Sequence, residues 1–229
     1  MMGQEYRVRS VAWEHVRVDS TYDARIPDEA VAIVNRYKNK VDSVMAPPLG
    51  LSRITMSVAR PESTLSNFMA DMVVAEATGT GLPYADMGLV NMGGIRTDLP
   101  EGIVTVGDAY SIAPFENTLV VLEMKGTDVL SLMQDIAAVG GEAVSSSVRL
   151  RIKDGKVAEA TIGGEPIDPK RTYTIATINY LAPGNDKLYS LKNHTKMTDT
   201  KILLREALME YILKKRVVDS KIEGRIVIE

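Results

Sequence analysis

The stretch "MGLVNMGGIR", residues 87–96, joins a short apolar run to a loop that contains two adjacent glycines and an arginine. A short apolar run bounded by turn residues is typical of a buried strand. Gly93 and Gly94 have no Cβ, so they permit positive φ angles and let a ligand approach the backbone N–H groups. Arg96 carries a guanidinium that can bind an anion bidentately. Because a plain turn beside a solvated arginine has the same sequence features, the flanking sequence has to decide between a site and a turn.

Regular elements are predicted on both sides of this stretch. Residues 5–18 alternate apolar and polar side chains and predict one or two short strands, which form an N-terminal appendage over residues 1–26. Asp154 and Gly155 mark a two-residue hairpin. Helical spacing and strand patterns alternate along the rest of the chain, with helices expected at 28–45, 63–79, 127–139 and about 199–216, and strands at 87–90, 118–124, 147–167, 171–181 and 223–229. The fold class predicted is α/β (α+β): a single compact domain over residues 27–229, with a mixed sheet and flanking helices.

Composition excludes several classes of function. The chain has 27 Lys and Arg against 30 Asp and Glu, a net charge of −3, so it lacks the broad positive surface that nucleic acids require. It has no cysteine, which excludes disulfides and thiolate metal sites, and only His15 and His194 are present to build a histidine metal centre. No apolar run approaches the roughly 18 residues of a membrane span. We therefore expect no nucleic-acid partner and no membrane span.

Two loops carry exposed-looking aromatic residues. Phe115, one of two phenylalanines, lies in the polar segment "APFENT" at 113–118, where it either packs in the core or offers a platform for a planar ring. Tyr180 precedes a Pro-Gly turn that is followed by Asn185 and Asp186. A ring and a carboxylate across a turn could stack a base and accept hydrogen bonds from sugar hydroxyls. Asn-Asp after Pro-Gly is also ordinary turn chemistry, so this segment alone leaves both readings open.

Four segments in the same order resemble the C-terminal domain of 5′-nucleotidases, the family that includes ecto-5′-nucleotidases and bacterial UDP-sugar hydrolases. They are "ESTLSN" at 62–67, "NMGGIR" at 91–96, "APFENT" at 113–118 and the turn from Tyr180 to Asp186. The resemblance covers about residues 28–229. It implies a 5′-nucleotidase C-terminal domain-like fold that binds a nucleotide or nucleoside.

The resemblance also implies roles for individual residues. Phe115 and Tyr180 match the two aromatics that sandwich the nucleobase, and Asp186 matches the carboxylate that holds the ribose hydroxyls. Asn91 and Arg96 match a polar pair that lines the substrate site. Gly93 and Gly94 shape the loop that carries this pair, and both glycines and Asn185 are also expected among the substrate-binding residues.

Two departures from the family pattern affect the expected ligand. Family members place an arginine three residues before the glutamate that matches Glu62, whereas this chain has Ala59 there and Arg60 one position later. We retain Arg60 as a candidate ligand contact. Glu116 replaces a glycine, and its charge would repel an anion, which favours a nucleoside or another less charged ligand.

The family reaction is hydrolysis of a phosphate ester by water activated between two metal ions, which are held by a separate N-terminal domain. This chain shows no Asp-x-His or Asn-His string, so we expect no catalytic residue, no metal ligand and no cofactor in it; divalent metals are expected only in a catalytic domain or partner elsewhere. Three hypotheses follow. The chain is the substrate-binding half of a split 5′-nucleotidase that acts with a separate metallophosphatase chain, a stand-alone nucleoside or nucleotide-binding module, or an inert remnant of the fold. By family analogy the location is periplasmic or extracytoplasmic, with a leader replaced by the Met-Met-Gly start.

Overall fold

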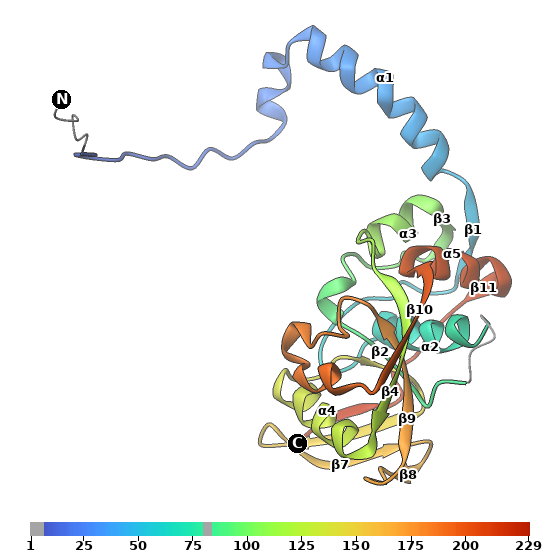
Figure 1. The fold of residues 1–229 in the computed structure, drawn as a ribbon. Helices are drawn as coiled ribbons and strands as arrows, with labels where there is room; N and C mark the ends of the chain where they lie inside the picture. The colour runs from blue at the N-terminus through green and yellow to red at the C-terminus, as the bar shows by residue number, and fades with distance from the viewer. Residues whose placement is uncertain (1–6, 80–83) are drawn as a thin grey trace, which may run out of the picture. The chain divides into compact units, whose positions relative to one another are not determined.

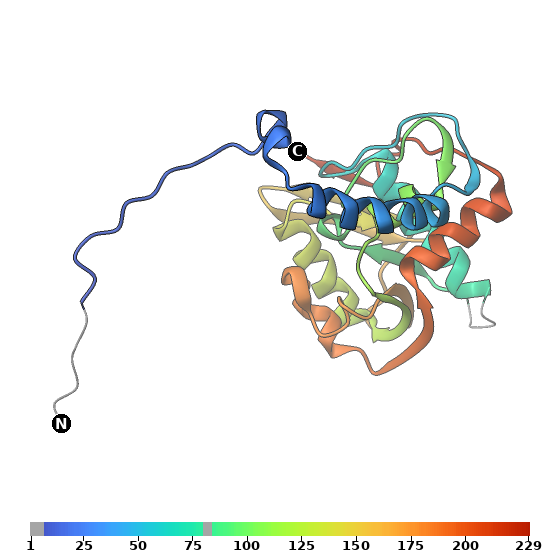
Figure 2. The same ribbon diagram turned by 90° about the horizontal axis from the view of Figure 1, so that it is seen from above.

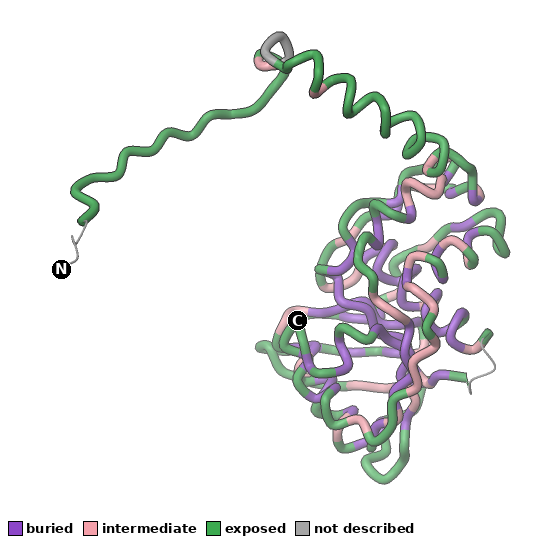
Figure 3. Tube along the Cα trace, turned by 45° about the horizontal axis from the view of Figure 1, so that its top comes forward, coloured by how far each residue is buried: buried purple, intermediate pink, exposed green. Residues whose placement is uncertain are grey.

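The computed structural model describes residues 7–79 and 84–229 and divides the chain into two compact units, Met1–Ser43 and Val44–Glu229. The first unit contains the short 3-10 helix η1 (Ser20–Arg25) and most of helix α1 (Asp28–Met45), which matches the helix predicted at 28–45. The structure divides the chain after residue 43, whereas the sequence predicts an N-terminal appendage that ends at residue 26. No residue of α1 is buried, and the trace of this unit is exposed along almost all of its described length (Figure 3).

The strands predicted between residues 5 and 18 are wrong for the described part, because residues 7–18 form no regular structure. A strand needs a neighbour to satisfy its backbone N–H and C=O groups, and no described strand pairs with this segment. Apolar residues do alternate with polar ones in this segment, but their side chains are exposed to solvent, as Trp13 is.

The described residues of the second unit form three sheets, and the predicted α/β (α+β) class with a mixed sheet and flanking helices is confirmed. The central sheet has five strands in the order β10-β4-β9-β2-β5 and is mixed, because β2 runs parallel to β9 while the other pairs are antiparallel (Figure 1). Its strands are β2 (Met87–Val90), β4 (Thr118–Lys125), β5 (Ala143–Val144), β9 (Thr172–Ile178) and β10 (Lys196–Leu203). The smaller sheets are β11-β1-β3, with β1 (Pro48–Ser52), β3 (Gly102–Thr105) and β11 (Val217–Val218), and β12-β6-β7-β8, with β6 (Val148–Lys153), β7 (Lys156–Ile162), β8 (Glu165–Pro166) and β12 (Ile226–Ile228).

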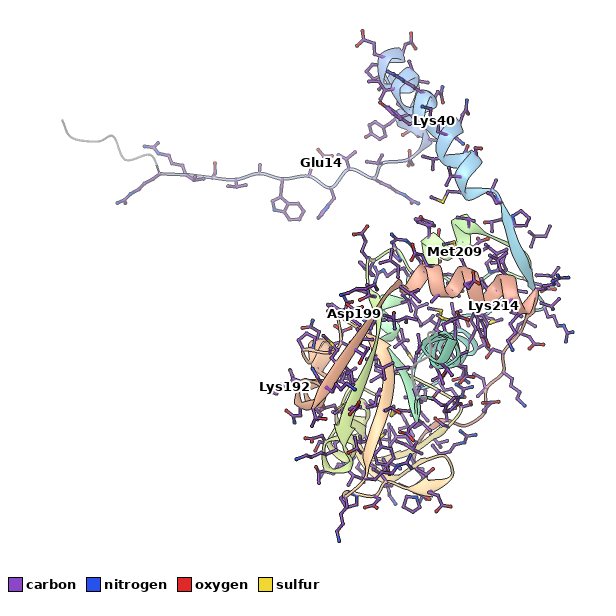
Figure 4. The ribbon with its side chains drawn as sticks, turned by 45° about the vertical axis from the view of Figure 1, so that its right-hand side comes forward. Glu14, Lys40, Lys192, Asp199, Met209 and Lys214 are labelled. Atoms are coloured by element: carbon purple, nitrogen blue, oxygen red, sulfur yellow. The ribbon has the colours of Figure 1, made fainter. Side chains whose placement is uncertain are left out.

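Helices cover both faces of the central sheet, whose strands β2 and β4 are therefore buried in consecutive runs rather than at alternate positions (Figure 2). Helix α2 (Thr64–Gly79) packs on β2 and β5, and α4 (Gly126–Ala138) follows β4. Gly88 of β2 permits the close approach of α2, since a Cβ there would lie 2.3 Å from the Ala70 carbonyl oxygen. Helix α5 (Leu204–Lys215) lies beside α2 and carries Met209 and Lys214 (Figure 4); the Lys214 ammonium is 3.0 Å from Oε2 of Glu76 in α2.

One predicted helix is partly wrong. Residues 199–203 continue strand β10 and are not helical; α5 begins at Leu204. The segment pairs antiparallel with β4, and its register shifts between Asp199 and Leu203, around Lys201 with its φ of 64°. Tertiary pairing with β4 overrides the helical periodicity here, and the β-branched residues Thr200 and Ile202 suit a strand.

The sequence reading also missed strands β1 and β3 and helix α3 (Val106–Ile112). Helix α3 begins with a capping box in which the Thr105 hydroxyl accepts a hydrogen bond from the Asp108 backbone N–H, while the Asp108 carboxylate accepts one from the Thr105 N–H. The spacing of Thr105 and Asp108 was a local signal that could have identified this start.

Candidate ligand-binding site

Three loops meet at one edge of the central sheet because of how its strands pair. Strands β2 and β9 run parallel, so the loops after them leave at the same edge, and β4 runs antiparallel to β9, so the loop before β4 arrives there (Figure 1). Two hydrogen bonds join the residue after β9 to the first residue of β4. The backbone N–H of Asn179 donates to the Thr118 carbonyl, and the side-chain oxygen of Asn179 accepts from the Thr118 N–H. Sequence segments far apart in the chain thereby become neighbours.

A cavity of about 320 Å³ lies where these loops meet, and we call it the ring cavity. Two aromatic rings line it: Phe115, 49% exposed, from the loop before β4, and Tyr180, 41% exposed, from the loop after β9. Among the described residues neither ring contacts another aromatic ring. The residues that line the ring cavity are Asn91, Gly93, Gly94, Phe115, Asn117, Tyr180 and Asp186.

A hydrogen-bonded carboxylate joins the two sides of the ring cavity. Oδ1 of Asp186 accepts from the Tyr180 hydroxyl at 2.9 Å, and Oδ2 accepts from Nδ2 of Asn91 at 2.6 Å. The hydrogen bond to the Asp186 carboxylate and its negative charge raise the pKa of Tyr180, so the hydroxyl stays a donor. Asn91 is only 4% exposed, and its amide oxygen has no hydrogen-bond partner within the described part of the chain. A buried acceptor without a partner is rare in folded proteins.

A second hollow of about 450 Å³ adjoins the ring cavity, with which it shares Gly93 and Asp186; we call it the side hollow. Arg60 lines it, but this guanidinium is already engaged: Nε donates to the Gly141 carbonyl at 2.8 Å and Nη2 to Oε1 of Glu142. The side hollow is lined by Arg60, Gly93, Ala138, Val139, Glu142, Asp186 and Lys187.

Glu142 accepts hydrogen bonds both from Arg60 and from the loop that contains Gly93 and Gly94. Its side chain is 2% exposed, and Oε2 accepts a 2.5 Å hydrogen bond from the backbone N–H of Met92 in η2 (Met92–Gly94). Burial raises the pKa of Glu142, against the Met92 hydrogen bond and the Arg60 charge, which lower it. Arg60 and Glu142 meet because the backbone next to each of them packs closely. Gly141, at φ 104°, lies so near Pro61 that a Cβ on it would be 2.6 Å from the Pro61 carbonyl oxygen.

Two residues expected at the site line neither cavity. Arg96 folds back along the chain and donates from Nη1 to the Gly93 carbonyl at 3.0 Å. Asn185 donates from Nδ2 to the Tyr180 carbonyl at 2.7 Å, which closes the turn between them. The structure thus brings together Asn91, Gly93, Gly94, Phe115, Tyr180 and Asp186, with Arg60 next to them, and leaves Arg96 and Asn185 outside. Neither Gly93 nor Gly94 has a positive φ.

The loop that carries Phe115 is held by a residue the sequence reading missed. Arg205 of α5, which is largely buried, donates to the carbonyls of Pro114 and Phe115, at 3.4 Å each, and its guanidinium lies 5.0 Å from the centre of the Tyr110 ring. Its Nη2 is 3.6 Å from Oε1 of Glu116, whose side chain points into solvent and lines neither cavity. The expectation that Glu116 repels a ligand is therefore not supported by its position.

The other missed residues are Asn117, Glu142 and Lys187. Asn117 lies within a segment that the sequence singled out, and Lys187 directly follows another. For Glu142 the sequence offers no indication other than the two glycines before it. Across residues 7–79 and 84–229 no group of three or more His, Cys, Asp or Glu side chains could hold a metal ion. No helix of the same residues is long and apolar enough to cross a membrane.

Known proteins share the sequence pattern and the fold of this chain. The family described as 5′-nucleotidase, C-terminal domain, matches residues 43–193. Protein UshA of Escherichia coli is 26% identical over 223 residues, which are 93% of this chain and 40% of UshA, and a 5′-nucleotidase of Vibrio vulnificus is 30% identical over 59% of this chain and 25% of its own length. The crystal structure of a 5′-nucleotidase precursor from Thermus thermophilus superposes with a TM-score of 0.77 at 26% identity over 88% of this chain and 43% of that one. This chain therefore spans less than half the length of these relatives.

Proposed function

Because this chain belongs to the 5′-nucleotidase C-terminal domain family, we propose that its ring cavity binds the base and sugar of a nucleoside or nucleotide. In this proposal Phe115 and Tyr180 stack on the base from opposite sides, and Asp186 accepts hydrogen bonds from the sugar hydroxyls. The observation that carries it is the position of these rings on one cavity, from two different loops, together with a carboxylate that accepts a hydrogen bond from the Tyr180 hydroxyl. Partly exposed rings with no aromatic neighbour leave their faces available for stacking.

The polar groups of the ring cavity complement a nucleoside. Asp186 already holds Tyr180 and Asn91, so its oxygens are fixed in place before a ligand arrives. Arg96 and Asn185, which line neither cavity, would support the loops rather than contact the ligand directly.

We further propose that the chain acts in nucleotide catabolism as the substrate-binding part of a 5′-nucleotidase-type phosphohydrolase. The dinuclear metal centre would be supplied by residues outside this chain, on a separate metallophosphatase chain, and the location would be periplasmic or extracytoplasmic. This proposal is supported by the family, which is described as the C-terminal domain of 5′-nucleotidases and matches residues 43–193. This chain would bind and orient the nucleotide, while the metals would activate the water.

Titration calorimetry with adenosine and a mononucleotide tests the binding step. The variants F115A and Y180A should each weaken binding about tenfold, because stacking on one aromatic side chain contributes about 1–3 kcal/mol. Y180F keeps the ring and loses only the hydrogen bond to Asp186, so it should bind more tightly than Y180A. Tyr189 is exposed and lines neither cavity, so Y189A is the matched control. Unchanged affinity in both F115A and Y180A would overturn the stacking arrangement.

Turnover measurements test the catalytic division. Adding the chain to a metallophosphatase encoded by the same organism should raise its nucleotide hydrolysis, and F115A should raise it less. If the chain binds nucleosides but leaves turnover unchanged with such a partner, it acts as a stand-alone binding module. If no nucleoside or nucleotide produces heat, the proposed function is wrong.

A further inference from the structure

Glu142 lies opposite the start of the η2 loop because of the register of the central sheet. Strands β2 and β5 pair antiparallel, and Val90 lies opposite Ala143 at the end of β2. The residue after β2 is Asn91, and the residue before β5 is Glu142. Beyond the last strand pair, Oε2 of Glu142 accepts the 2.5 Å hydrogen bond from the Met92 N–H. A buried side chain thus satisfies the first backbone donor of the loop.

The peptide group between Asn91 and Met92 is held on both sides. Its N–H donates to Glu142, and its carbonyl oxygen, which belongs to Asn91, accepts from the Gly94 N–H at 3.0 Å. The backbone of Asn91 is extended, with φ −73° and ψ 130°, and a rotation of this peptide group would break both hydrogen bonds. Met92 is 3% exposed, so its N–H needs an acceptor from within the protein.

The orientation of this peptide group determines where the Asn91 side chain lies. That side chain is buried, and its Nδ2 donates to Oδ2 of Asp186 at 2.6 Å. Gly94 packs against it, since a Cβ on Gly94 would lie 2.7 Å from Oδ1 of Asn91. Asp186 also accepts from the Tyr180 hydroxyl in the ring cavity. A continuous set of contacts therefore leads from Glu142 through Asn91 to Asp186.

A purely structural role for Glu142 would need only its ion pair with Arg60. Arg60 is, however, already joined to the segment before β5 by the 2.8 Å hydrogen bond from its Nε to the Gly141 carbonyl. The ion pair uses Oε1 of Glu142 and leaves Oε2 for the Met92 N–H. Arg60 thus fixes the carboxylate, and the carboxylate fixes the loop.

We propose that Glu142 is a positioning residue for the ring cavity, which acts through the Met92 N–H and Asn91 on Asp186. The inference rests on the proposed nucleoside site, because Asp186 is the group through which Glu142 would affect a ligand. Glu142 lines the side hollow and not the ring cavity. Its replacement should therefore change the affinity for a nucleoside without removing a direct contact to the base.

Titration calorimetry with adenosine tests the effect on binding. E142A should weaken binding about five- to tenfold, because a buried N–H without an acceptor no longer holds the loop in place. E142Q keeps a side-chain oxygen that can accept from the Met92 N–H, so it should retain most of the affinity. Glu76, a buried carboxylate of α2 that pairs with Lys214 and lines neither the ring cavity nor the side hollow, supplies the control variant E76A, whose affinity should be unchanged.

A double-mutant cycle separates positioning from a general loss of structure. If Glu142 acts through Asn91, N91A already removes its effect, so N91A/E142A should bind no more than about twofold more weakly than N91A. Losses that multiply in the double variant, or an E142A affinity equal to that of the unmodified protein, would overturn the positioning role. An E142Q affinity as low as that of E142A would overturn the route through the Met92 N–H.

A measurement without ligand keeps this inference separate from the proposed function. In NMR spectra of the amide groups, E142A should shift the signals of the Asn91 side-chain amide and the Met92 backbone amide, and E76A should leave both unchanged. If adenosine does not bind the unmodified protein but these signals respond, the proposed function is wrong and Glu142 still positions Asn91. If adenosine binds and the Asn91 signal is the same in E142A, the role of Glu142 is overturned and the nucleoside site stands.

Discussion

Replacing Gly94 and Gly93 separately by alanine perturbs the site in two different ways. At Gly94 the new Cβ would lie 2.7 Å from Oδ1 of Asn91 and 3.2 Å from its Cγ and Nδ2, which is closer than van der Waals contact allows. At Gly93 the nearest atom is 4.0 Å away. Both glycines lie in η2 with negative or extended φ angles, so backbone strain does not separate the two variants. The difference between them therefore reports the packing of the Asn91 side chain.

The magnitude follows from what Asn91 would lose. Its buried amide cannot move outward without breaking the 2.6 Å hydrogen bond from Nδ2 to Asp186, and a hydrogen bond to a charged group contributes about 1.5–3 kcal/mol. Replacing glycine by alanine also restricts the unfolded chain, which stabilises both variants by about 0.4–1 kcal/mol. We expect G94A to be about 1.5 kcal/mol less stable than the unmodified protein, and G93A to be equal to it or slightly more stable. For a unit of this size that is a fall in Tm of about 3–6 °C in G94A.

Thermal unfolding followed by circular dichroism measures this difference, and calorimetry with a nucleotide measures the second expectation. G93A should fold normally yet bind more weakly, because its methyl group enters the space beside Gly93, which lines both the ring cavity and the side hollow. Equal Tm values for G94A and G93A would refute the reasoning about Asn91. Unchanged nucleotide affinity in G93A would refute a ligand position beside Gly93.

Three further predictions concern groups outside the stacking rings. R225A should lose about 3–5 kcal/mol of unfolding free energy in urea, because the Arg225 side chain is 3% exposed and pairs with two carboxylates. The control variant R151A removes an arginine from an exposed ion pair and should lose less than about 1 kcal/mol. Similar losses in both variants would contradict this prediction. E142Q tests the pH dependence of stability. Because the pKa of Glu142 is raised in the folded protein, its contribution to the free energy of unfolding is complete below the ordinary pKa of 4.5 and is lost as pH rises through the raised pKa. E142Q should therefore gain stability relative to the unmodified protein over that window, with Arg60 free to reach water. A constant stability difference between pH 4 and pH 8 would argue against a raised pKa. R205A should weaken nucleoside binding by about tenfold through a loosened Phe115 loop, and an affinity equal to that of the unmodified protein would show that Arg205 does not position the ring.

The comparison of sequence and structure shows where local patterns fail. The helix at 28–45, the helix after residue 62, the strand at 118 and the hairpin at Asp154 and Gly155 are set by periodicity and turn chemistry, and all occur in the structure. The local pattern of residues 199–203 predicts a helix, but these residues extend strand β10, which pairs with β4. Residues 7–18 had the pattern of a strand and no described partner, so their alternation produced none.

For the site, the sequence by itself determined the residue types: a glycine loop after a buried strand, two aromatics in polar loops, and a carboxylate in a tight turn. Only the tertiary structure decided which of these meet, because the parallel pairing of β2 with β9 and the antiparallel pairing of β4 with β9 bring the loops to one edge. It also decided that Glu142, 82 residues from Arg60 along the chain, forms an ion pair with that arginine. The physical reason is range: turn chemistry and periodicity act over a few residues, whereas strand pairing and the pairing of buried charges depend on distances that exist only in the folded chain.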